Sequence, residues 1–100
     1  RMALARVRVA LRSEEGDPEE FTRRLESDPL DLEAASSLAD HLLARGDAEA
    51  AFRPLLHIVT VADGDTRDAA RRRLVELLDS LPPDDARAMA ARRALSRALF

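Results

Sequence analysis

The chain has 100 residues, of which 46% are hydrophobic and 35% are charged, and its formal net charge is −3. This length can bury one modest core and therefore predicts a single domain over residues 1–100. The small negative charge disfavours a generic nucleic-acid-binding protein, the absence of cysteine excludes thiol redox chemistry within these residues, and charges interrupt every apolar run before it could span a membrane.

The first half of the chain begins with two predicted helices. Apolar residues recur with helical period between Met2 and Arg12, which predicts a first helix there. Asp17 followed by Pro18 is typical of a helix start, and this second helix is expected to end near Ser27. It offers few apolar anchors, so it must lean on a neighbour to be stable.

The stretch 32–63 predicts two amphipathic helices folded back on each other. Asp31 is expected to cap the first helix, Gly46 to end it in the left-handed conformation, and Asp47 to cap the second. A turn this short allows only an antiparallel pair. The two apolar stripes that should face each other are Ala35, Leu38, Ala39 and Leu42 in the first helix and Ala48, Ala51, Phe52, Leu55 and Val59 in the second.

Two further helices are predicted after Gly64. Asp65 or Thr66 should open the fifth helix, the run from Leu81 to Pro83 should stop it, and Asp84 should cap the sixth. The expected buried positions are Ala70, Leu74, Leu77, Leu78 and Leu81, followed by Ala88, Ala91, Leu95, Ala98 and Leu99. The prediction is therefore an all-α fold of about six helices, arranged as stacked antiparallel hairpins.

The central pair resembles a tetratricopeptide repeat. The residues that fall at the spacings of the repeat are Leu38, Ala39, Leu42, Gly46, Asp47, Ala51 and Leu55. The pair departs from the repeat at Ala35, where the repeat has a bulky aromatic residue, at Leu42, where it has tyrosine, and at Asp63, where it has proline. The small residues let the two helices approach closely, so we expect a divergent repeat flanked by atypical hairpins.

The flanking segments ESDPLDLEA and RRALSRALF are similar to the helical C-terminal domains of chaperedoxins, which are thioredoxin-fold co-chaperones. The resemblance implies that residues 1–100 are the C-terminal part of a longer chain with a thioredoxin-fold domain upstream. It also implies a bacterial, cytoplasmic protein that binds unfolded clients and/or the chaperonin. All sixteen basic residues are Arg, which we attribute to a GC-rich genome.

No catalytic arrangement is apparent in the sequence. His41 and His57 lack cysteine partners and metal-ligand spacing, and the carboxylates cluster at helix starts, where capping explains them. We therefore expect no enzymatic activity, no cofactor and no metal. The run from Arg67 to Arg73 is interpreted as a solvated face that pairs with acidic neighbours, since no aromatic residue accompanies it.

Two surfaces are candidates for binding proteins. The concave groove of the central pair should be lined by Glu33, Ser36, Asp40 and Leu43, and this acidic lining argues against recognition of a peptide carboxylate. The second candidate is the outer edge of the last helix, with Met89, Arg93 and Phe100. Alternatively, Phe100 folds back to seal the stack.

The sequence thus predicts a non-enzymatic domain that binds other proteins, without affinity for nucleic acid or membrane. The alternative function is a structural or self-association module with no chaperone role.

Overall fold

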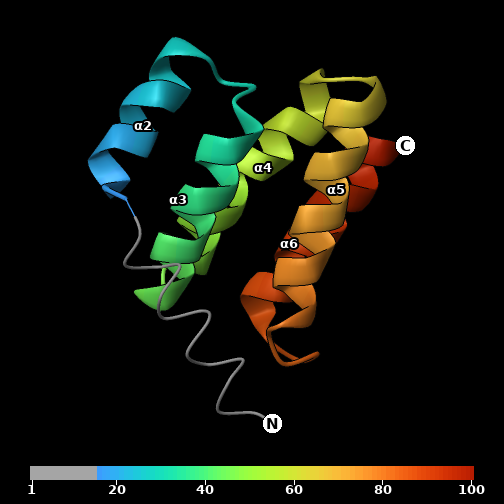
Figure 1. Cartoon of the computed structure of the whole chain (residues 1–100). Helices are drawn as coiled ribbons and strands as arrows, with labels where there is room; N and C mark the ends of the chain where they lie inside the picture. The colour runs from blue at the N-terminus through green and yellow to red at the C-terminus, as the bar shows by residue number, and fades with distance from the viewer. Residues whose placement is uncertain (1–15) are drawn as a thin grey trace, which may run out of the picture.

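The computed structural model describes residues 16–100, and within this range the chain forms five α-helices and no strand (Figure 1). Their bounds are α2 (Pro18–Ser27), α3 (Leu32–Ala44), α4 (Ala48–Val61), α5 (Gly64–Asp79) and α6 (Ala86–Leu99). The predicted all-α fold is confirmed. The first predicted helix, at residues 2–12, lies outside the described residues.

Aspartates begin three of these helices as the sequence predicts. The side chains of Asp17, Asp31 and Asp47 accept hydrogen bonds from backbone N–H groups two or three residues further on, at 3.0, 3.0 and 3.3 Å. Each bond satisfies an N–H group that has no partner inside its helix. The starts of α2, α3 and α4 are therefore determined by local sequence.

The starts of the last two helices differ from the prediction. Asp85 caps α6, not Asp84, because the chain turns through residues 83 and 84 and Asp85 directly precedes the first helical residue. The α5 helix begins at Gly64, with Asp63 as an N-cap residue that makes no side-chain hydrogen bond. Gly64 has φ +57° and therefore forms part of the α4–α5 turn.

The α3–α4 turn has the predicted glycine geometry. Gly46 has φ +82°, its N–H donates to the carbonyl of Leu43, and the N–H of Asp47 donates to the carbonyl of Leu42, both at 2.9 Å. These two bonds are the Schellman arrangement, which satisfies carbonyl groups left open at a helix end. The turn reverses the chain and sets α4 antiparallel to α3.

The core lies around α4, which packs against α3, α5 and α6. In the core cluster, α3 contributes Ala35 and Ala39 and the start of α4 contributes Ala48 and Ala51, and such small side chains let two packed helices approach closely. The largest fully buried side chains are Phe52, Leu55, Ile58, Val59, Leu74 and Leu78. In Figure 1, α3 and α5 lie toward the viewer, with α4 and α6 behind them.

The α2 helix buries no residue of its own and depends on α3, as predicted. Its Phe21 ring lies 6.0 Å from the ring of buried His41, measured between centroids. Arg24 donates two hydrogen bonds to the carboxylate of Asp31, at 3.0 and 3.1 Å. Hydrogen bonds from the Ala34 N–H and from Arg24 lower the pKa of Asp31, and this ion pair fixes the loop between the two helices.

Candidate protein-interaction surfaces

Three of the four residues predicted for the concave groove lie together. Glu33, Ser36 and Asp40 of α3 line a cleft of about 710 Å³, whose other residues include Arg73 of α5. Leu43 is not among the lining residues and is instead half-buried against the core. The predicted groove is therefore a cleft between α3 and α5, which we call the α3–α5 cleft.

Arg73 connects the two walls of this cleft. Its Nε donates to the hydroxyl of Ser36 at 2.7 Å, one terminal nitrogen donates to Glu76 at 3.0 Å, and the other donates to Asp40. The Arg73 and Asp40 side chains are only 15% and 16% exposed. Both are thus shielded from solvent, and each is the main counter-charge of the other.

The position of Arg73 differs from the prediction for the arginine run. Arg72 is exposed as expected, but Arg73 shares a side of α5 with buried Ala70 and Leu77 and lies over α3. The predicted pairing with acidic neighbours is present at Arg73, which pairs with Asp40 and Glu76. The predicted solvated face is wrong there, since the long side chain packs its stem and extends its charge to Asp40. The cleft nevertheless keeps an excess of carboxylates, with Glu33 and Glu76 at its rim.

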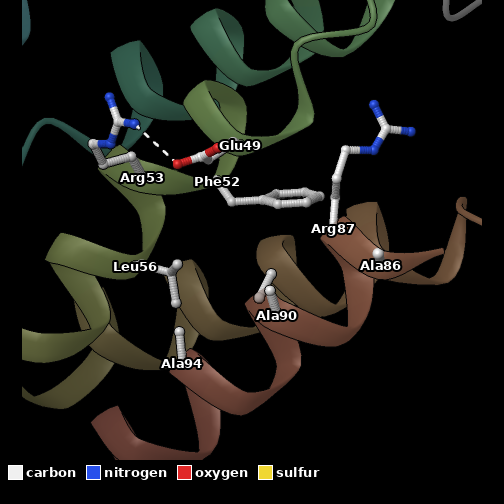
Figure 2. A pocket seen from close by; sticks show the side chains of 9 residues that line it. Glu49, Phe52, Arg53, Leu56, Ala86, Arg87, Ala90 and Ala94 are labelled. Carbon is white, nitrogen blue, oxygen red and sulfur yellow. Dashed lines mark ion pairs between the residues drawn. The ribbon is translucent and has the colours of Figure 1, made fainter.

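A second hollow lies between α4 and α6 (Figure 2). It has a volume of about 510 Å³, and we call it the α4–α6 groove. One wall is formed by Phe52 and Leu56 of α4, and the other by Ala86, Ala90 and Ala94 of α6. These alanines recur every four residues, so they form one row along the helix.

Charged residues border the groove. On α4, Arg53 pairs with Glu49 at 3.7 Å across one turn, as Figure 2 shows. At the start of α6, Arg87 binds the carboxylate of Asp85 at 2.9 Å and donates to the carbonyl of Gly46 at 3.0 Å. The groove is therefore apolar inside and charged at its rim.

The Arg87–Asp85 pair also defines local electrostatics. Hydrogen bonds from the Arg87 guanidinium, and from the N–H groups of Arg87 and Ala88, lower the pKa of Asp85 to about 2. The same pair raises the pKa of Arg87. Asp85 is thus an anion near neutral pH, and its charge is matched by Arg87. The α6 helix itself contains no carboxylate that could pair with its other arginines.

The predicted edge residues of α6 lie on the protein surface. Met89 is 45% exposed and Phe100 is fully exposed, so Phe100 does not fold back to seal the stack. Arg93 is exposed beside them and forms no ion pair within residues 16–100. The edge therefore presents two large apolar side chains and a cation to solvent.

Sequence reasoning missed the alanine row of the α4–α6 groove. It assigned α6 a buried stripe and one outer edge, and both are present. The overlooked signal is that Ala86, Ala90 and Ala94 extend the apolar arc of α6 beyond what one neighbouring helix covers. Small side chains contribute little to a hydrophobicity pattern, yet they leave the groove open.

The fold and these surfaces define a stack of antiparallel helical hairpins, a class of domain that mediates protein–protein interactions or serves as a structural module. The family model described as tetratricopeptide repeat matches residues 11–100. The chain therefore belongs to the tetratricopeptide-repeat family.

The chain is similar to proteins of mycobacteria. The chain is 37% identical over 70 residues to "Uncharacterized protein Mb1359" of Mycobacterium bovis and to "Uncharacterized protein Rv1324" of Mycobacterium tuberculosis. The match covers 70% of this chain but 23% of each relative, so the chain spans about a quarter of their length. No solved structure matches it with significance.

Within residues 16–100, no helix combines the length and apolar character that crossing a membrane requires. The same part of the chain contains no group of His, Cys, Asp or Glu side chains arranged to hold a metal ion.

Proposed function

We propose that this domain is the protein-binding part of a bacterial, cytoplasmic thioredoxin-like co-chaperone, and that it binds client proteins, the chaperonin, or both without catalysing a reaction. Membership of the tetratricopeptide-repeat family supports a role in protein interaction. The similarity of the segments around residues 26–34 and 92–100 to chaperedoxins supports the co-chaperone role.

The observation that favours this function most is the exposed apolar surface of α6. One side of the helix fills the core through Ala88, Ala91 and Leu95. Two other parts remain uncovered, namely the alanine row of the groove and the edge formed by Met89 and Phe100. Uncovered apolar surface bordered by charges is typical of a protein-binding site.

The edge can be tested by changing Met89→Ser and Phe100→Ser together. Because both side chains are exposed, we expect the melting temperature to stay nearly constant, as for surface substitutions within about 0.5 kcal/mol. Binding to purified chaperonin, and suppression of aggregation of an unfolded client, should both weaken. Leu30→Ser is a matched control, since Leu30 is an exposed leucine in the α2–α3 loop.

Unaltered chaperonin binding and unaltered client protection would contradict the proposal, as would an equal effect of the Leu30→Ser control. The nature of the whole protein is tested separately by the sequence encoded before Arg1. A thioredoxin-fold pattern there supports the co-chaperone, whereas an unrelated domain would overturn it and leave only the general role in binding proteins.

A further inference from the structure

The charge of α6 differs from that of the chain as a whole. The chain has a net charge of −3, yet the segment Ala86–Leu99 contains Arg87, Arg92, Arg93 and Arg97 and no carboxylate. Arg87 and Arg92 are matched by Asp85 and Asp79. Within residues 16–100, Arg93 and Arg97 form no ion pair, and both are exposed. The outer side of α6 is therefore locally cationic.

These unmatched arginines lie beside the alanine row. On a helix with 100° between residues, Arg93 and Arg97 project between the Met89 edge and Ala90. A ligand seated on Ala90 and Ala94 would thus meet the two guanidinium groups along one of its flanks. On the other wall, half-buried Leu56 offers apolar contact, whereas Phe52 is only 2% exposed (Figure 2).

The shape of the groove fits a helix. The alanines at 86, 90 and 94 extend over about 12 Å, or roughly two helical turns. Small side chains let a second helix approach closely, and residues spaced by four on that helix can then fill the hollow of about 510 Å³. An amphipathic helix with aliphatic residues on one side has this spacing.

A second copy of this chain is a poor occupant. If two copies paired through α6, each would bring the arginines at 87, 92, 93 and 97 and no carboxylate from Ala86–Leu99, so the closest charges would repel. Nucleic acid is a poorer occupant of the groove itself, because its floor is alanine and its one aromatic lining residue, Phe52, is 2% exposed, and the exposed ring of Phe100 lies outside the lining. Charge complementarity favours carboxylates on the partner.

We infer that the α4–α6 groove binds an acidic amphipathic helix of a partner protein. Its aliphatic side chains lie over Ala90, Ala94 and Leu56, and its carboxylates face Arg93 and Arg97. This inference rests on the proposed role of the domain in binding proteins and specifies the partner's chemistry.

The test uses two synthetic peptides and the 100-residue chain. The acidic peptide has about 18 residues, enough for stable helix formation, with leucine at every fourth position of one face and glutamate on both flanks. Its twin carries lysine in place of glutamate. Fluorescence anisotropy should show that the acidic peptide binds, that binding weakens as salt is raised, and that the lysine peptide binds at least about tenfold more weakly.

Three variants locate the binding. Arg93→Glu with Arg97→Glu should weaken binding of the acidic peptide by at least about tenfold and strengthen binding of the lysine peptide. Ala90→Gln, at an exposed position, should weaken binding of the acidic peptide, because the longer side chain fills the groove. The matched control Arg23→Glu with Arg72→Glu makes the same charge change at exposed sites of α2 and α5, and it should leave the preference between the two peptides as it is in the wild type. Circular dichroism of every variant confirms its fold.

Equal binding of both peptides, or an equal loss in the control variant, would overturn the inference. It would also be overturned if an oligonucleotide of the same charge bound as tightly, or if sedimentation showed a dimer that Ala90→Gln abolishes. If the acidic peptide fails but Met89→Ser with Phe100→Ser still loses chaperonin binding, only this inference falls. If the peptide binds while chaperonin and clients do not, only the co-chaperone role falls.

Discussion

The ion pair between Arg73 and Asp40 is expected to contribute more stability than any exposed pair of this domain. It joins α3 to α5, two helices with few other mutual contacts, and both side chains are largely shielded from solvent. Removing one partner of a fully buried pair costs about 3 to 5 kcal/mol. Because these side chains keep 15% and 16% exposure, we expect about 2 kcal/mol for Arg73→Met, which preserves the stem.

A double-mutant cycle separates the pair from the packing around it. Arg73→Met and Asp40→Ala, made singly and together, should give a coupling energy of about 1.5 kcal/mol in urea unfolding followed by circular dichroism. Arg53 and Glu49 provide a control within the same chain, because they pair at 3.7 Å with exposures of 73% and 86%. Their coupling should stay below about 0.5 kcal/mol.

The two pairs should also respond differently to salt. About 1 M NaCl should reduce the coupling of the exposed pair nearly to zero and that of the shielded pair only in part. Equal coupling energies, or equal salt dependence, would refute the reasoning, because both results would mean that Arg73 and Asp40 are solvated.

Three further predictions concern the core, the turn and the capping of α6. Leu55→Ala, at a fully buried site in the core, should destabilise by about 2 to 5 kcal/mol, and Leu38→Ala, which is 8% exposed, should lie at the lower end of this range in urea unfolding. Gly46 has φ +82° and open space around its missing Cβ, so thermal melts should show Gly46→Asn tolerated and Gly46→Val costing more than about 1 kcal/mol. Asp85 has a folded-state pKa of about 2, below its ordinary 3.8. Its contribution to the free energy of unfolding is therefore fully present above the ordinary pKa and is lost as the pH falls toward 2. Melting temperatures between about pH 5 and pH 2 should therefore fall less steeply in Asp85→Asn than in the wild type.

The elements that the sequence predicted well are those governed by neighbouring residues. Gly46 can adopt φ +82° because it has no Cβ. The aspartates at 17, 31 and 47 can cap their helices because each accepts a hydrogen bond from an N–H group within three residues. Buried stripes are equally local, since residues three and four apart share a helix face. The sequence predicted Asp84 as the cap of α6, but Asp85 is the cap, because residues 83 and 84 form a turn before the helix begins.

The features that the sequence did not predict depend on residues far apart in the chain. Arg73 reaches Ser36 and Asp40, which are 37 and 33 positions away, so no local pattern could distinguish it from Arg72. The α4–α6 groove likewise depends on how α6 crosses α4. Its alanines look like ordinary helix-forming residues until Phe52 and Leu56 lie opposite them.

The two surfaces use arginine in opposite ways, and this difference indicates where an acidic partner can bind. In the α3–α5 cleft, Arg73 is already held by Asp40, Glu76 and Ser36, so an incoming carboxylate would have to displace a bound one and would face Glu33 as well. That this cleft does not recognise a carboxylate stays a prediction, and the contacts that already hold Arg73 support it. On α6, Arg93 and Arg97 are exposed and have no ion-pair partner within residues 16–100, and they lie beside an apolar groove. An acidic helix gains there both apolar burial and charge pairing without displacing any contact of the fold.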